Sequence, residues 1–174
     1  PKAGWGAGAV QLVEIPTVDE TFDNIVAFWN PAEKPQPGQE LLMGYRLYWC
    51  TEPPVRSPLA RIVATRTGIG GIVGQKRPYY SHRFTIDLAG GDLDLLDHSP
   101  LVKPVITASS GKVELTSARP LASIRGYRVM FDLRPDESTE PVTLRMYLGV
   151  DGQALSETWL YEWQPPPLAE RKLI

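Results

Sequence analysis

The sequence predicts an all-β protein, a sandwich or barrel with almost no helix. Its 17 prolines and 15 glycines divide the 174 residues into short runs that are rich in Val, Ile, Leu, Thr, Tyr and Trp. Runs of this kind at near-regular spacing are typical of all-β folds. Several runs also alternate apolar and polar residues, which is the pattern of a strand with one buried face and one wet face.

Ten strands are expected along the chain. They are placed at residues 9–15, 24–29, 40–49, 59–67, 79–88, 103–109, 112–117, 124–133, 142–149 and 155–163. Alternation is clear where Phe84, Ile86 and Leu88 share one face, and it recurs at 127–133 and 142–148. These three strands are therefore expected to line the core. Trp159 and Trp163 also share a parity that suits a buried face.

Two dipeptides predict turns. Asp151-Gly152 lies between the last two expected strands, and it is a strong hairpin signal because a type I′ turn needs positive φ at both central residues. Ser110-Gly111 is a second, weaker turn signal. Helix is expected only as one turn at 93–97.

Prolines also divide the chain into parts. Three prolines in NPAEKPQPG predict a stiff, extended linker at 31–38. Residues 39–165 then carry about eight strands, which suits an immunoglobulin-like β-sandwich, and three consecutive prolines begin a loose tail at 166–174. Residues 1–30 carry only two strands, too few to bury a face alone. They should belong to a partner domain or pair with the sandwich.

Composition excludes several classes of protein. The formal charge is −2, from 18 basic and 20 acidic residues, whereas a nucleic-acid surface usually needs a basic face. No apolar run approaches the roughly 20 residues of a membrane span. The single cysteine, Cys50, cannot form an internal disulfide. Because the chain starts at Pro1 without a signal peptide, we expect a processed or excised fragment.

Several features that suggest chemistry have a simpler structural explanation. The glycine-rich segment TGIGGIVGQK, residues 67–76, lacks the Gly-Lys-Ser/Thr ending and the helix of a phosphate loop, so it is expected to connect two strands. His82 and His98 lack metal-ligand spacing, and Cys50 is expected to be a packed or idle thiol. The sequence therefore predicts no catalytic residue, no metal ligand and no cofactor.

The acidic cluster in VEIPTVDETFDN is the strongest candidate site. Carboxylates can serve as acid and base on a glycosidic bond or hold sugar hydroxyls by charge-assisted hydrogen bonds. Trp5 lies between glycines and is available to stack on a sugar ring or to lie at a domain seam. The candidate substrate-binding residues are Trp5, Glu14, Asp19, Glu20 and Asp23. The alternative is a solvated acidic loop, and a calcium ion on the three later carboxylates is disfavoured because no EF-hand loop exists.

Long segments resemble the periplasmic glucan biosynthesis protein G/D family, the osmoregulated periplasmic glucan proteins. The resemblance covers essentially the whole chain and is most specific in GAVQLVEIPTVDETFDNIVAFWN, residues 8–30. It continues at 31–49, 60–74, 111–120 and 155–163. The opening Pro1-Lys2-Ala3-Gly4-Trp5-Gly6 is similar to a family Pro-Lys-Gly-Asp-Trp-Gly pattern but departs from it at Ala3 and Gly4.

The resemblance implies a location, a substrate class and a domain plan. Family members act in the periplasm on a β-1,2-linked glucan backbone. A large N-terminal β-sandwich carries the ligand cleft, and a smaller immunoglobulin-like domain follows. The chain then corresponds to the immunoglobulin-like domain at 39–165, preceded by the last strands of the larger β-sandwich at 1–30. The catalytic aspartates of the family's hydrolases lie upstream, so no catalytic residue is carried over.

Three functions from different classes follow. The first is an accessory, carbohydrate-associated or domain-packing module of a protein for osmoregulated glucan biosynthesis. The second is an interaction module that docks on the membrane glucan synthase machinery. The third is part of a β-1,2-glucan hydrolase whose catalytic residues lie upstream. The expected partners are β-1,2-glucan, through the parent protein, and the missing N-terminal domain. The open edges of the first two strands also predict self-association.

Overall fold

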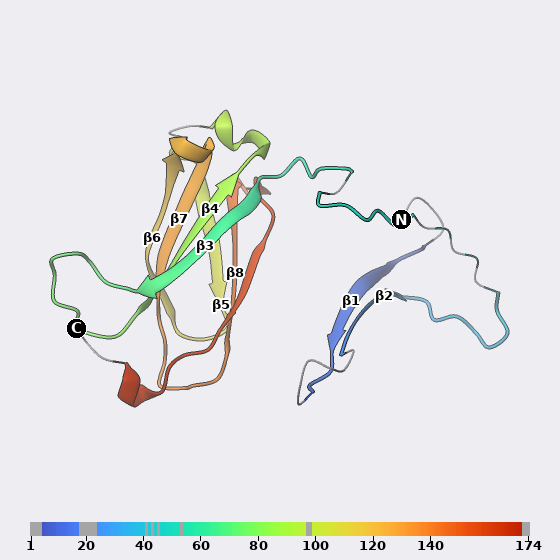
Figure 1. Cartoon of the computed structure of the whole chain (residues 1–174), viewed down its shortest axis with the longest axis horizontal. Helices are drawn as coiled ribbons and strands as arrows, with labels where there is room; N and C mark the ends of the chain where they lie inside the picture. Colours follow the sequence, from blue (N-terminus) through green and yellow to red (C-terminus); the bar gives the residue numbers. More distant parts are fainter. Residues whose placement is uncertain are drawn as a thin grey trace. The chain divides into compact units, whose positions relative to one another are not determined.

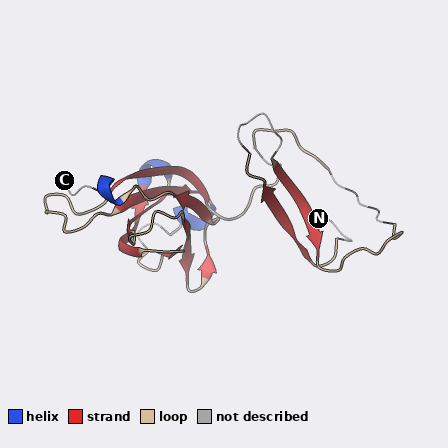
Figure 2. Cartoon of the chain, turned by 90° about the horizontal axis from the view of Figure 1, so that it is seen from below, coloured by secondary structure: helices blue, strands red, loops and turns tan. Residues whose placement is uncertain are grey.

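The computed structural model describes residues 5–17, 24–40, 42, 44, 46–52, 54–96 and 99–171. Contacts divide the chain into two units, Pro1–Pro54 and Val55–Ile174. The described residues are nearly all in strands, turns and loops (Figures 1 and 2), which confirms the all-β prediction. Helix in the described residues consists of three short 3-10 segments, η1 (Gly91–Asp94), η2 (Ala122–Ile124) and η3 (Leu168–Glu170). The first of these overlaps the helical turn expected at 93–97.

In the described residues of the first unit, two strands form an antiparallel pair. β1 (Gly8–Glu14) pairs with β2 (Ile25–Pro31) in a register that runs from Gly8 opposite Pro31 to Glu14 opposite Ile25. We call this pair the β1–β2 ribbon. The strands predicted at 9–15 and 24–29 are therefore confirmed.

The strand predicted at 40–49 is wrong for the residues described there. Positions 42, 44 and 46–49 are not in a strand, and no described residue pairs with them. A short run rich in apolar residues does not by itself make a strand, because the backbone N–H and C=O groups also need a neighbouring strand. The division between units falls after Pro54. The domain bounds expected from the sequence, a linker at 31–38 and an immunoglobulin-like domain at 39–165, stay predictions.

The second unit is built from two antiparallel sheets. One sheet has the order β3-β4-β7-β6, from β3 (Arg61–Ile69), β4 (His82–Ala89), β7 (Gly126–Arg134) and β6 (Lys112–Leu121). The other has the order β10-β8-β5, from β10 (Trp159–Trp163), β8 (Val142–Val150) and β5 (Lys103–Ala108), and the short β9 (Gln153–Ala154) pairs with β8. Figure 1 shows the strands of the two sheets lying in separate layers.

The apolar faces of these two sheets form one core. The predicted alternation is confirmed, since Phe84, Phe131 and Met146 are fully buried together with their same-parity neighbours. The rings of Phe84 and Phe131 stack at 5.2 Å, and Trp159 of the opposite sheet lies edge-on to Phe84 at 5.8 Å. Trp159 and Trp163 are 5% and 7% exposed, as their parity predicts. The unit is therefore a β-sandwich, and its immunoglobulin-like type stays a prediction.

Two turns and one bridge connect the strands of the sandwich. Asp151 and Gly152 have φ angles of 48° and 82° and link β8 to β9, which confirms the hairpin turn. The Ser110-Gly111 turn instead joins β5 to β6, which belong to different sheets. Just before β3, the buried Ala60 forms a parallel bridge with Ser156. Its N–H donates to Leu155 O at 2.9 Å, and its C=O accepts from Glu157 N at 2.9 Å.

The C-terminal segment is held in place as far as it is described. Arg171 donates to the carbonyl oxygens of Pro166, at 2.9 Å, and Ser138, at 2.6 Å, and also to that of Asp136. The tail predicted to be loose at 166–174 is thus tied to the loop after β7 up to Arg171. A guanidinium can do this because it offers five N–H donors in a fixed plane.

Candidate functional site

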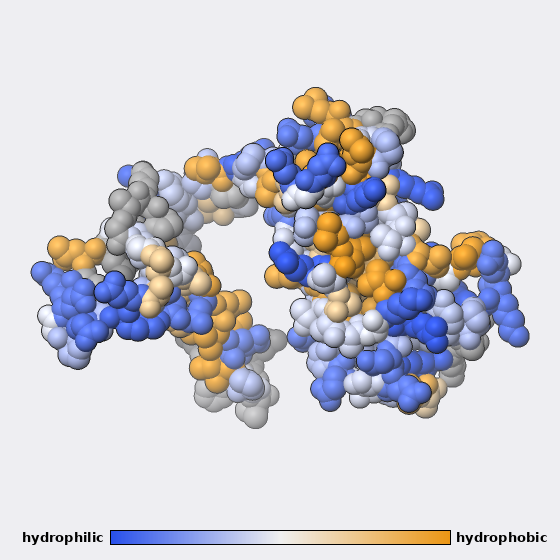
Figure 3. All heavy atoms as spheres, turned by 180° about the vertical axis from the view of Figure 1, so that it is seen from behind, coloured by the Kyte–Doolittle hydropathy of each residue, from blue (hydrophilic) through white to orange (hydrophobic). Residues whose placement is uncertain are grey.

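The β1–β2 ribbon carries apolar side chains on both faces. Residues opposite each other in the register share a face, so one face holds Val10, Leu12, Ile25 and Trp29 and the other holds Val13, Val26 and Phe28. Val10 and Leu12 are 73% and 71% exposed, and Phe28 is 43% exposed. Apolar surface of this unit is visible as orange in Figure 3. A strand with one wet face would alternate instead, so the ribbon has the composition of strands covered on both faces.

Trp5 packs against the ribbon. Its ring lies edge-on to that of Trp29 with 5.8 Å between centroids, and its carbonyl accepts a hydrogen bond from Trp29 Nε1 at 3.2 Å. Trp29 in turn lies over Gly8, where a Cβ atom would come within 2.7 Å of the indole. Trp5 is therefore half-buried and held against the ribbon by its contacts with Trp29.

Glu14 lies at the other end of β1. It is exposed and shares the face of Leu12, opposite Ile25. Val10, which pairs with Trp29, precedes it by four residues, or roughly 13 Å at about 3.3 Å per residue. The structure thus does not bring Trp5 and Glu14 together. Asp19, Glu20 and Asp23 lie outside the described residues, as does the calcium hypothesis that rests on them.

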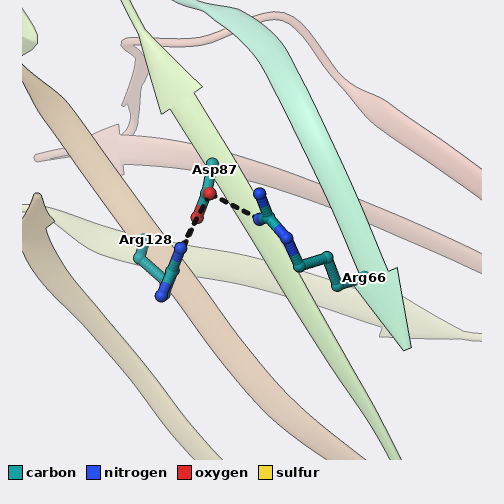
Figure 4. A network of polar contacts seen from close by, with 3 residues as sticks. All are labelled: Arg66, Asp87 and Arg128. Carbon is teal, nitrogen blue, oxygen red and sulfur yellow. Dashed lines mark hydrogen bonds and ion pairs between the residues drawn. The ribbon is translucent and has the colours of Figure 1, made fainter. Parts of the chain in front are cut away.

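The outer face of the β3-β4-β7-β6 sheet carries a compact ion-pair network (Figure 4). Asp87 accepts from Arg128 at 2.6 and 2.9 Å and from Arg66 at 2.7 Å. The hydrogen bonds from Arg128, and then that from Arg66, lower the pKa of Asp87, although burial opposes them. The Asp87 side chain is only 4% exposed, because the two arginines cover it. The network ties three neighbouring strands together.

A second buried carboxylate anchors the loop between β3 and β4, residues 70–81, which we call the β3–β4 loop. Asp132 accepts from Arg83 Nε at 2.6 Å, from Arg83 Nη2 at 3.0 Å and from the Gly71 N–H at 2.7 Å. Arg83 also donates to Gly71 O at 2.7 Å. A Cβ atom at Gly70 would lie 2.2 Å from Ser81 Oγ. Only glycine at position 70 lets the loop approach the sheet this closely.

A third polar cluster lies beside this loop. The Tyr79 hydroxyl donates to Glu114 Oε2 at 2.5 Å, and Lys112 forms an ion pair with Glu114 at 3.0 Å. These contacts, that of Tyr79 first, lower the pKa of Glu114. The hydrogen bond to Glu114 in turn raises the pKa of Tyr79. The Arg134 guanidinium lies 4.1 Å from the centre of the Tyr79 ring, a cation–π distance.

Two pockets meet at Tyr79. One, of about 350 Å³, is lined by residues of the β3–β4 loop, Arg77 among them, and by Glu114, Leu115 and Asp132 of the sheet. The other, of about 620 Å³, is lined by Tyr79, Tyr80, Lys112, Arg134 and Arg171 among others. Their volumes lie in the range of small-molecule sites. Sequence reasoning missed both, because their residues come from strands far apart in the chain.

The remaining residues with chemical potential lie elsewhere. His82 stacks on Trp163 at 4.9 Å, and burial lowers its pKa, so it belongs to the core edge. Cys50 is exposed, and His98 lies outside the described residues. Within the described ranges, no group of three His, Cys, Asp or Glu residues is placed to hold a metal ion.

The fold and these surfaces define a class of protein: a two-sheet β-sandwich preceded in sequence by an apolar two-stranded ribbon. None of the helices in the part of the chain described here is long and apolar enough to cross a membrane. Comparison with known proteins then gives the family. Residues 1–163 match the family model described as "Periplasmic glucan biosynthesis protein, MdoG". The chain belongs to this family, which is named for the periplasm, and the resemblance inferred from the sequence is confirmed.

Several similar proteins carry the name glucans biosynthesis protein D. The chain is 63% identical over 176 residues to "Glucans biosynthesis protein D" of Xanthomonas axonopodis pv. citri, covering 99% of this chain and 33% of the relative. It is 63% identical over 174 residues to "Probable glucans biosynthesis protein D" of Shewanella oneidensis, covering 99% and 32%. It is 64% identical over 168 residues to the Stenotrophomonas maltophilia protein, covering 96% and 32%. The chain thus spans about one third of the length of these relatives.

Proposed function

We propose that this chain works within a longer periplasmic protein for β-1,2-glucan biosynthesis or processing, as an accessory module. In this proposal the β1–β2 ribbon joins the sheet of a glucan-handling domain, and the sandwich packs beside that domain. Family membership and the names of the relatives support the general role. The ribbon supports the specific one.

The observation that carries the proposal is the ribbon's two apolar faces. Val10 and Leu12 on one face, and Val26 and Phe28 on the other, are between 43% and 73% exposed. At about 25 cal/mol per Å² of apolar surface, leaving such side chains in water forfeits roughly 1 to 2 kcal/mol each. Further strands beside the ribbon and layers over both faces would recover that free energy. They would also pair its outer edges.

The proposal gives Trp5 and Glu14 a role at the edge of the glucan cleft. An accessible part of an oriented indole can lie against the apolar face of a sugar ring. A carboxylate on an otherwise apolar face is favourable only where it meets solvent or a polar ligand. Because the two residues lie at opposite ends of β1, they would contact different sugar units of one oligosaccharide.

A matched pair of substitutions tests the ribbon's role in the longer protein. Leu12 and Leu160 are 71% and 67% exposed, and both lie in strands. We expect Leu12→Asp to lower the melting temperature of the longer protein and to impair glucan processing, because it places a charge inside a covered sheet. Leu160→Asp should change both far less. Equal effects of the two substitutions would refute the proposal.

Deletion of the sandwich tests its accessory role. Removing residues 55–174 from the longer protein should leave the glucan-handling part folded, as judged by circular dichroism, but should reduce processing. If the remaining protein folded and processed glucan as before, the accessory role would be refuted. In that case the family membership would stand, and the sandwich would need another function.

A further inference from the structure

The pocket under the β3–β4 loop has the properties of a preformed binding site. Its volume of about 350 Å³ can hold a molecule the size of a monosaccharide derivative. The loop that covers it is fixed to the sheet by Asp132, Arg83 and the close approach at Gly70. These contacts hold the start of the loop, at Gly70 and Gly71, against the sheet beside the cavity.

The carboxylates of this pocket are already satisfied. Asp132 accepts three hydrogen bonds from Arg83 and Gly71. Glu114 accepts from Tyr79 and forms an ion pair with Lys112. Neither carboxylate needs a cation from a ligand, so the pocket is not built to bind one.

Two cations that line the pocket have no counterpart. Arg77 Nη1 is buried without a hydrogen-bond partner among the described residues, and the Arg77 stem packs against Gly71, where a Cβ atom would come within 3.0 Å. Lys76 forms no ion pair with the described residues. A buried N–H group without an acceptor costs roughly 1 to 3 kcal/mol, and more when it is charged. Lys76 and Arg77 therefore give the pocket positive charge that no ion pair among the described residues neutralises.

The opposite wall of the pocket is unusual as well. Leu115 has a φ angle of 49°, in the left-handed region that a leucine rarely adopts. It lies in an irregularity of β6 between Glu114 and Ser117, and it is 45% exposed. Irregularities of this kind redirect side chains beside binding sites. Here Leu115, Ile72 and Pro78 give the pocket an apolar part next to its cationic part.

We propose that this pocket binds a small organic anion, whose carboxylate or phosphate group meets Arg77 and Lys76 and whose carbon skeleton lies against Leu115 and Ile72. The guanidinium suits both anions, because its planar N–H groups match either geometry. The site lies wholly within the second unit. It is independent of the ribbon and of the proposed glucan role, so each proposal can fail alone.

Titration of the whole chain followed by amide NMR tests the site. The probes are glucose 6-phosphate, glucuronate, neutral glucose and inorganic phosphate. We expect saturable shifts at Ile72, Arg77 and Leu115 with one or both organic anions, with a Kd of about 1 mM or tighter. Glucose and inorganic phosphate should each bind at least several-fold more weakly. Which organic anion binds better identifies the preferred headgroup.

Two arginine substitutions separate the site from general charge. Arg77→Gln should weaken binding about tenfold, since it removes a charge-assisted hydrogen bond. Arg119→Gln makes the same change in net charge at an exposed arginine of β6 that lines neither described pocket, and it should leave the Kd unchanged. If Arg77→Gln does not fold, Lys76→Gln on the exposed loop replaces it, with an expected loss of about threefold.

Several results would overturn the inference. One is that neither organic anion gives saturable shifts. Another is that glucose binds as tightly as glucose 6-phosphate. A third is that Arg77→Gln and Arg119→Gln weaken binding of the organic anion equally. Binding of inorganic phosphate as tight as that of the organic anions would also overturn it, since the apolar wall would then have no part. None of these outcomes depends on whether substitutions in the ribbon impair glucan processing.

Discussion

The two units of this chain use similar strands in opposite ways. In the sandwich, alternation directs Phe84, Phe131 and Met146 to one side, and all are fully buried. In the β1–β2 ribbon, apolar residues point to both sides, and Leu12 remains 71% exposed. A two-stranded sheet cannot cover its own faces. The sandwich thus buries a core of its own, whereas the ribbon has a sequence suited to strands that need neighbours.

Substitution of one phenylalanine in each unit gives the largest expected contrast. Phe84 is fully buried and contacts rings of both sheets, including Phe131 and Trp159, so Phe84→Ala should lower the free energy of unfolding by about 4 kcal/mol. Phe28→Ala in the ribbon should lower it by less than about 1 kcal/mol. Urea unfolding followed by tryptophan fluorescence measures both. Similar losses would mean that the ribbon is as well packed as the sandwich.

Replacement of one carboxylate in each unit should give a somewhat smaller contrast in stability. Asp132→Asn leaves the Arg83 guanidinium without its partner under the β3–β4 loop, and we expect a loss of about 3 kcal/mol. Glu14→Gln, at an exposed position of the ribbon, should change stability by no more than about 0.5 kcal/mol. Urea unfolding at neutral pH tests the pair. A negligible effect at Asp132 would contradict the anchoring of the loop.

The ion pairs of the outer sheet face predict an acid-sensitive sandwich. The pKa of Asp87 is lowered in the folded protein, so its contribution is complete above its ordinary pKa of about 3.9 and is lost as the pH falls through the lowered value. Asp87→Asn should therefore reduce stability at pH 7 and flatten its decline below about pH 4. Unfolding curves between neutral and acid pH measure this. Parallel declines in both proteins would show that Asp87 does not contribute.

Two turn glycines provide the smallest contrast. Gly152 has a φ of 82° between β8 and β9, and Gly38 of the first unit has a φ of 80°. Alanine is strained in both conformations. Gly152→Ala should cost about 1 kcal/mol of sandwich stability, whereas Gly38→Ala should leave the sandwich transition in place. If Gly38→Ala shifted the unfolding transition of the sandwich, the two units would have to unfold as one cooperative system.

Strand periodicity made much of the sandwich predictable. Parity alone places Phe84, Val129 and Leu144 in the core, and backbone sterics predict the turn at Asp151-Gly152. The strand expected at 40–49 is absent at the described positions of that range, because an apolar-rich run does not supply a pairing partner. The Ser110-Gly111 dipeptide predicts a turn. It does not predict that the turn joins strands of different sheets, because sheet membership depends on long-range contacts that the local sequence does not encode.

The candidate surfaces were less predictable than the fold. The acidic cluster and Trp5 were found by residue type, yet only Trp5 and Glu14 of that set lie in the described residues, and they lie apart. The glycine-rich pattern of the β3–β4 loop does not by itself indicate the pocket at Arg77. The signal that could have found it is the charged run Lys76-Arg77 beside Tyr79. This run indicates a binding site only once the fold places Glu114 and Asp132 beside it.

The parallel bridge at Ala60 has a mechanical consequence. Ala60 is the point where the chain enters the sandwich, and its N–H and C=O bonds to Leu155 and Glu157 hold it beside the segment that leads into β10. Because the two segments run in the same direction, tension between the first unit and the C-terminal end pulls them past each other. The two hydrogen bonds then resist together, in shear, rather than opening one after the other. A pull transmitted through the first unit would meet this clamp before it reached the core.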